Sequence, residues 1–178
     1  DLNALPVCLQ SIDFIWSNAA LHWLDDLPET FQEFNRVLRV GGLLMFSLFG
    51  PDTLKELRQA TQMVASAMRI DRTQSFVDMH DVGDMLVNSG FSDPVMDMEF
   101  LGLDYSSDSI LLSDAIALNL LDANYQNSAI ATQLPQKLTL EVVYGHAWAL
   151  GKNLAKAQDD VAYIGLNQIG RKTRNDSA

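Results

Sequence analysis

Polar side chains end a strongly apolar stretch near the start of the chain, in the sequence DFIWSNAALHW from Asp13 to Trp23. Ser17 and Asn18 follow directly on the apolar residues, and His22 stands four positions later. In open α/β sheets, ligands bind outside the carboxyl ends of the strands, where small polar residues let the backbone approach them. A plain turn is the alternative, since Ser and Asn favour turns on their own account. The stretch therefore indicates either a binding pocket or an ordinary strand-to-loop turn.

The charge of the chain argues against a nucleic-acid partner. The 178 residues carry a formal net charge of −11, whereas nucleic-acid binding depends on Lys and Arg that neutralise phosphates. Small molecules or a neutral-to-basic partner fit better. No apolar run reaches the roughly 18 residues of a membrane span, so no membrane association is expected. The single Cys8 excludes an internal disulfide and favours the cytoplasm, and without ligand spacing among the three histidines no metal site is expected.

Two apolar strands flank a helix in the first third of the chain. The run Ile12–Trp16, apolar except for Asp13, does not alternate strictly and is typical of a strand that is covered on both faces. The sequence DDLPE predicts the start of a helix with an Asp cap and an early proline, and Gly41–Gly42 predict its end. Its apolar stripe consists of Leu27, Phe31, Phe34 and Leu38. A second strand over Leu43–Leu48 completes a right-handed βαβ unit.

Further helices are expected downstream of this unit. Asp52 is placed to cap a helix, and Asp78 or His80 to open a short one that ends at Gly90. Another helix is expected from about Ile110.

Two further strands follow in the second half. Val95–Tyr105 alternates between apolar and acidic residues, which predicts a strand nearer the sheet edge. Leu138–Ala149 is long and nearly free of charge. The order β-α-β-α-α-β-α-β favours an open α/β sheet. We expect residues 1–150 to form one part of a domain and residues 151–178 a polar, loosely ordered tail.

Several motifs resemble the second half of the class I methyltransferases. They are SNAALHW, RVLRVGG, FSLFGPDTLKELR, FVDMHDVGDMLVNSGFSDPVMDME and VVYGHAW. Within that superfamily the chain is most similar to the malonyl-acyl-carrier-protein methyltransferases of biotin synthesis, over most of residues 11–105 and again over about 138–150. The resemblance implies a partial Rossmann-like fold without its first strands. Its sheet would be mostly parallel, with the antiparallel last strand between the two strands that precede it.

The resemblance also implies a cofactor, an acceptor and site residues. The cofactor would be S-adenosylmethionine, and the methyl acceptor a small acid or an acyl-carrier-protein-bound carboxylate. The implied cofactor-binding residues are Ser17, Asn18, Ala19 and Leu21. Of these, Leu21 would lie toward the acceptor, together with His22.

His22 and His80 are the candidate catalytic residues. The pKa of an imidazole lies near neutrality, so His22 could be a general base. An ionised carboxylate needs little base catalysis, however, because positioning carries the rate, and His22 is then a pocket-lining residue. For His80 the alternative is helix capping. Trp23 is expected in the core.

Two departures from the family pattern bear on activity. No G-x-G-x-x-G motif occurs, so we expect half of the cofactor site to be missing and methyl transfer by this chain alone to be weak or absent. The apolar edge of Ile12–Trp16 would then invite self-association, unless residues 2–9 cover it. After Ser109 the resemblance implies basic residues, but Ser113 and Ile116 stand there.

The loss of a basic residue disfavours a malonyl acceptor, because arginine pairs with carboxylates through its planar fork. The acidity of the chain also opposes docking of an acidic carrier protein. Two alternatives therefore stay open. One is a non-catalytic binding or assembly homologue. The other is an arginine-hydroxylase-like enzyme on the same scaffold, similar to a mitochondrial complex I assembly factor.

Overall fold

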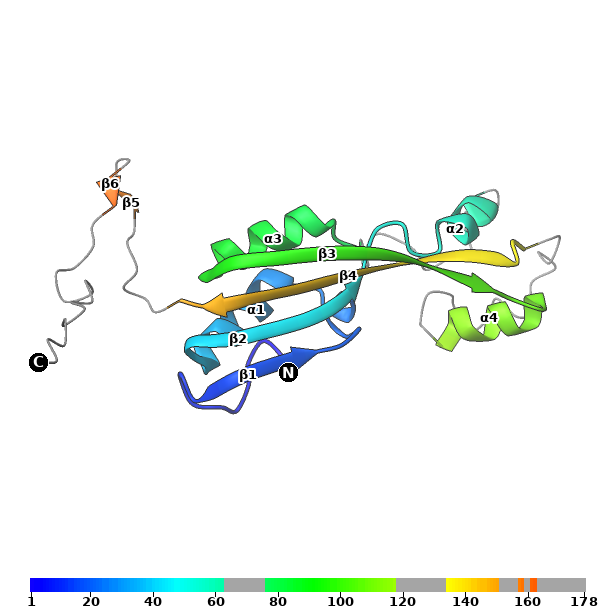
Figure 1. Cartoon of the computed structure of the whole chain (residues 1–178). Coiled ribbons are helices and arrows are strands. Elements are labelled where there is room, and N and C mark those ends of the chain that lie inside the picture. Colours follow the sequence, from blue (N-terminus) through cyan, green and yellow to red (C-terminus); the bar gives the residue numbers. More distant parts are fainter. Residues whose placement is uncertain (63–75, 118–133, 151–156, 159–160, 163–178) are drawn as a thin grey trace, which may run out of the picture.

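A mixed four-stranded sheet forms the centre of the computed structural model, which describes residues 1–62, 76–117, 134–150, 157–158 and 161–162 (Figure 1). The order across the sheet is β1 (Ile12–Ser17), β2 (Leu38–Phe49), β4 (Lys137–Ala149) and β3 (Phe91–Asp104). β1 and β2 are parallel, and β4 is antiparallel to both of its neighbours. The expected position of the antiparallel last strand is confirmed.

The helix α1 (Leu27–Val37) connects β1 to β2 and starts as the sequence predicts. The Asp26 side chain accepts a hydrogen bond of 2.8 Å from the Glu29 backbone N–H. The predicted end at the glycine pair is wrong, because α1 ends at Val37 and β2 begins at once. Gly41 instead lies inside β2 with φ +77°. Glycine adopts this left-handed backbone easily. It is typical of a β-bulge, where one strand has residues without a partner on the neighbouring strand.

Helices α1 and α3 (Met79–Asn88) cover one face of the sheet (Figure 1). Asp78 caps α3, accepting a hydrogen bond of 2.8 Å from the His80 backbone N–H. Gly90 follows the helix with φ +91°, as expected of a helix end. The main core between these helices and the sheet includes Leu21, Phe31, Phe34, Leu44, Phe46, Val82, Leu86 and Val143. The apolar stripe predicted for α1 is therefore buried.

A second, smaller core lies where β3 and β4 extend beyond β2, next to α2 (Lys55–Gln62) and α4 (Asp108–Ala117) (Figure 1). Its buried members are Leu54, Leu57, Leu111, Ala115, Leu134 and Leu138. The buried Glu141 of β4 accepts a hydrogen bond of 2.6 Å from the Asp52 backbone N–H. The Asp52 carboxylate itself pairs with Lys55 at 2.9 Å. These contacts tie the segment after β2 to the sheet.

Parts of the expected pattern lie outside the described residues. They include the end of the helix after Ala117 and most of the tail from residue 151. Within that tail the structure describes one short antiparallel ladder, between β5 (Ala157–Gln158) and β6 (Val161–Ala162).

The expectation that β1 is covered on both faces is wrong for this chain. Phe14 and Trp16 are 48% and 71% exposed. They alternate along β1 with Ile15, which packs against the main core beneath α1 and α3, so they lie on the opposite face of the sheet. We call it the open sheet face, and its exposed apolar members are Phe14, Trp16, Met45, Val95, Tyr144 and Trp148.

The N-terminal segment packs on α1 rather than on the free edge of β1. The Leu5 backbone N–H donates a hydrogen bond of 2.7 Å to Glu33. Arg36 donates hydrogen bonds to the carbonyls of Leu5 and Val7, at 3.3 and 2.9 Å. Residues 2–9 therefore do not cover the edge, because their backbone is held by the helix. Within the described residues β1 has a strand neighbour on one side only.

Candidate functional site

The polar end of β1 is held against β2 by one side chain, Ser47. Its hydroxyl donates a hydrogen bond of 2.6 Å to the Asn18 Oδ1. The Ser47 Oγ also accepts a hydrogen bond of 2.9 Å from the Ala19 backbone N–H, which lies 3.1 Å from the Ser47 carbonyl oxygen as well. Ser47 is buried at 4% exposure. Sequence reasoning missed it, although a lone hydroxyl within the apolar run LLMFSLF was a signal.

Ala19 adopts a left-handed backbone conformation, with φ +46°. A non-glycine residue in this region carries roughly 1–2 kcal/mol of strain and needs surrounding contacts to hold it. The Ala19 backbone N–H has two such contacts, with the hydroxyl and with the carbonyl oxygen of Ser47. Ser17 precedes this turn as the last residue of β1. Backbone and side-chain polar groups are thus concentrated at one carboxyl end of the sheet, where ligands of open α/β folds bind.

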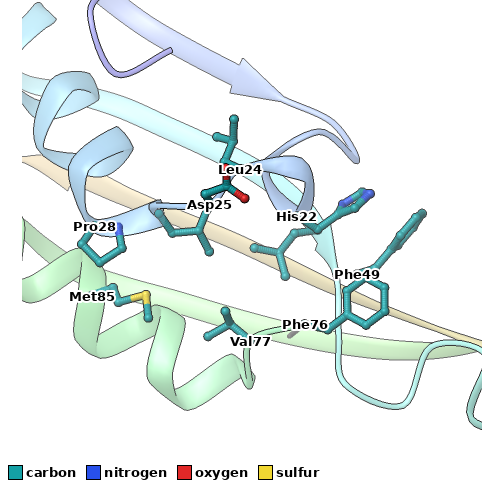
Figure 2. A pocket seen from close by; sticks show the side chains of 10 residues that line it. His22, Leu24, Asp25, Pro28, Phe49, Phe76, Val77 and Met85 are labelled. Carbon is teal, nitrogen blue, oxygen red and sulfur yellow. The ribbon is translucent and has the colours of Figure 1, made fainter. Parts of the chain in front are cut away.

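A cavity of about 220 Å³ lies beyond this turn, at the end of β2 (Figure 2). His22 reaches it from the short 3-10 helix Leu21–Trp23. The other lining residues come from the segment before α1 and its start, the end of β2, the segment before α3 and α3 itself. They are Leu24, Asp25, Leu27, Pro28, Leu48, Phe49, Phe76, Val77 and Met85. The lining side chains are therefore apolar apart from one carboxylate and one imidazole.

His22 has an unusual environment for a polar ring. It stacks on Phe49 with a centroid distance of 4.2 Å and an interplanar angle of 26° (Figure 2). Both ring nitrogens are buried, and neither has a hydrogen-bond partner among the described residues. Burial lowers the pKa of His22 to about 4, because desolvation disfavours the charged imidazolium. The ring is therefore neutral at physiological pH and a weak base.

The other sequence-derived candidates lie in different surroundings. Leu21 is fully buried in the main core, beside the site rather than open to it. His80 is exposed in the first turn of α3 and does not line the cavity. The expectation that Trp23 is a core residue is wrong, because the side chain is 36% exposed next to His22. Ser113 is exposed on α4.

The described residues contain neither a cluster of metal-binding side chains nor a helix that could span a membrane. No group of three or more His, Cys, Asp or Glu side chains there could hold a metal ion. None of the helices in the same ranges combines the length and the apolar character that a membrane crossing requires.

Comparison with known sequences supports the resemblance. A family model described as "Methyltransferase domain" matches residues 1–46. A malonyl-[acyl-carrier protein] O-methyltransferase of Gallionella capsiferriformans is 46% identical, over 83% of this chain and 56% of that protein. The corresponding protein of Nitrosospira multiformis is 42% identical, over 83% of this chain and 53% of its own length. The chain spans about half the length of these curated relatives.

Solved structures show the fold. The YcgJ protein from Bacillus subtilis aligns with a TM-score of 0.55 at 13% identity, over 84% of this chain and 69% of that one. The BH2331 protein from Bacillus halodurans C-125 aligns with a TM-score of 0.56 at 12% identity, over 85% and 70% of the two chains. At such identities the agreement concerns the fold alone. The expected α/β fold of class I methyltransferases is confirmed.

Proposed function

We propose that this chain forms the acceptor side and part of the cofactor site of a methyltransferase. It belongs among the relatives of the malonyl-[acyl-carrier protein] O-methyltransferases. The reaction would move a methyl group from S-adenosylmethionine to a carboxylate, with a carrier-bound malonyl group in biotin synthesis as the acceptor. The supporting observation is the turn after β1 that Ser47 holds, followed three residues beyond Ala19 by His22 in its cavity, in a chain 46% identical to such a relative. The sequences of the relatives favour methyl transfer over the hydroxylase alternative, and we place the enzyme in the cytoplasm.

The residues at the end of β1 fit the amino-acid portion of the cofactor. S-adenosylmethionine, when bound, supplies a methyl group that its sulfonium sulfur activates. Ser17 and Asn18 offer polar side chains, and Ala19 in the same turn has a left-handed backbone. In this proposal Ser47 is a positioning residue, because it acts by holding Asn18 and Ala19. Leu21 supports the turn from the core.

His22 lines the acceptor side and stays neutral. An ionised carboxylate already has the electron pair that forms the new O–C bond, so no proton has to be removed. A histidine with a pKa of about 4 suits this task, because it orients a group without competing for a proton. We leave His80 out of the proposed site, since it is exposed outside the cavity.

The function is tested by incubating the protein with S-adenosylmethionine and malonyl-acyl carrier protein and measuring the intact mass of the carrier. A gain of one CH₂ supports methyl transfer. A gain of one oxygen atom on an arginine-containing protein substrate would support the hydroxylase alternative instead. A chain that binds S-adenosylhomocysteine but transfers no methyl group would fit the expected incomplete site, whereas neither binding nor transfer would contradict the proposal.

A Ser47→Ala variant tests the positioning role. Loss of the hydroxyl removes two hydrogen bonds that hold the turn, so we expect S-adenosylhomocysteine to bind about fivefold to tenfold more weakly. Ser92→Ala is a matched control, because Ser92 is a serine on β3 of the same sheet, away from the turn. Equal affinity of both variants would contradict the role of Ser47.

We also propose that the open sheet face and the edge of β1 associate with a second copy of the chain when it is alone in solution. The edge presents unpaired backbone groups beside exposed apolar side chains, which favours strand pairing between copies. Sedimentation should give a dimer mass, and Trp16→Lys should shift it toward the monomer. Val87→Lys is the control, since Val87 is 54% exposed on α3, on the other side of the sheet. A monomeric wild-type chain would refute this.

A further inference from the structure

We propose that the open sheet face docks an amphipathic helix of a partner protein, one that carries Lys or Arg along a flank of its apolar stripe. The inference goes beyond methyl transfer, because it concerns a docking surface and not the reacting groups. It also names the partner that replaces a second copy of the chain on this face. Each copy carries a formal net charge of −11, so a second copy brings no surplus of cations to it.

A row of side chains crosses the open sheet face from β1 to β3. Trp16 pairs with Met45 in the strand register, and Met45 pairs with His146. His146 in turn pairs with Val95. A groove of about 420 Å³ lies over this row, and the rest of its lining consists of Asn18, Phe46, Ser47, Asp97, Tyr144 and Gly145. Apolar grooves of this kind take the apolar stripe of a helix.

The topology of the sheet favours a helix as the occupant. Parallel strands such as β1 and β2 belong to sheets that helices cover on both faces, and here α1 and α3 cover only the face with the main core (Figure 1). On the open sheet face, Phe14, Trp16 and Trp148 remain exposed. A contiguous exposed apolar surface of this kind marks an interaction site. An amphipathic helix covers it while its own polar side stays in water.

Two carboxylates on β3 define the charge of the partner. Asp97 pairs with Tyr144 and Glu99 with Val142 in the strand register, which places both acidic residues along the open sheet face. The Tyr144 hydroxyl donates a hydrogen bond to Glu99 and holds that carboxylate beside the face. Both acidic residues are exposed, and within the described ranges no cationic side chain forms an ion pair with either. A basic flank therefore complements this margin, whereas an acidic flank is repelled.

Binding of two designed peptides tests the inference. Both have about 18 residues, roughly 27 Å as a helix, and share one apolar stripe, but one carries Lys and the other Glu along the same flank. The chain has three tryptophans, and in a Trp23→Phe background the remaining Trp16 and Trp148 both lie on the open sheet face. We expect the Lys peptide to shift their emission to shorter wavelength. It should bind about tenfold more tightly than the Glu peptide at low ionic strength, and salt should reduce the difference.

Variants with equal net charge separate local from overall electrostatics. Asp97→Asn combined with Glu99→Gln should reduce the preference for the Lys peptide to about threefold or less. Asp81→Asn combined with Asp84→Asn is the matched control, since it removes two exposed carboxylates from α3, and it should keep the preference. Equal affinities of the two peptides, or equal effects of the two double variants, would overturn the inference.

Sedimentation of the peptide complex tests the competition with a second copy. The Lys peptide should give a complex that contains one copy of the chain, because peptide and second copy use the same face. A complex that contains two copies would contradict this competition. The assays contain neither cofactor nor methyl acceptor, so failure of the proposed function would leave these results standing.

Discussion

The pH dependence of stability should carry a contribution from His22, and replacing this residue should remove it. The ordinary pKa of histidine is 6.5, and burial lowers that of His22 to about 4 in the folded chain. Between these values the unfolded chain binds a proton that the folded chain does not. Stability therefore falls as the pH falls from about 6.5 toward 4, and the contribution is fully present above pH 6.5.

The magnitude follows from the size of the pKa change. The difference 6.5 − 4 = 2.5, at 1.36 kcal/mol per pH unit, corresponds to about 3.4 kcal/mol as an upper bound. The side chain is only half-buried, and solvent screens part of this effect. We therefore expect a loss of about 1–2 kcal/mol in the free energy of unfolding between pH 7 and pH 4.5.

The assay is urea unfolding at several pH values for the wild type, His22→Phe and His80→Gln. His22→Phe should lose less stability on acidification than the wild type, by the amount given above, while His80→Gln should follow the wild type. Glu33 adds an acid-sensitive contribution of its own, because its hydrogen bond with Arg36 lowers its pKa below the ordinary 4.5. That contribution is lost only as the pH falls below this value, and it is common to all three proteins. Identical pH profiles for the wild type and His22→Phe would refute the reasoning.

Two packing and capping predictions follow. A Cβ atom at Gly145 would lie 2.7 Å from the Phe46 Cε1, so Gly145→Ala should destabilise the chain by about 1–3 kcal/mol through overpacking. Gly102→Ala, with nothing within 4 Å of its Cβ, should leave the urea midpoint within error, and equal midpoints for the two variants would contradict the packing. Asp26→Ala should lower the free energy of unfolding by about 1 kcal/mol because α1 loses its N-cap hydrogen bond. Asp26→Asn keeps an acceptor there, and if Asp26→Ala proved as stable as Asp26→Asn, the cap would have no role.

Local rules were sufficient for much of the fold. The Asp cap of α1, the Asp78 cap of α3 and the glycine after α3 were all readable, because capping depends on side chains within three residues. The apolar stripe of α1 likewise predicted its buried face. The end of α1 was not readable, since the glycine pair that marks a helix end in sequence serves a strand irregularity here. A left-handed glycine fits both, and only the pairing of β2 with β1 decides between them.

The candidate site was likewise predictable in part from the sequence, and the rest of it depends on the tertiary structure. The sequence alone indicated a polar turn after β1 and a histidine close to it, because both belong to one continuous stretch of residues. Only the tertiary structure placed Ser47 against that turn, since the two segments are far apart in the chain and meet through the β1–β2 pairing. It alone enclosed the His22 ring among side chains from α1, β2 and α3. The low pKa and the unpartnered nitrogens of His22 follow from that enclosure, because desolvation is a property of the surroundings and not of the residue.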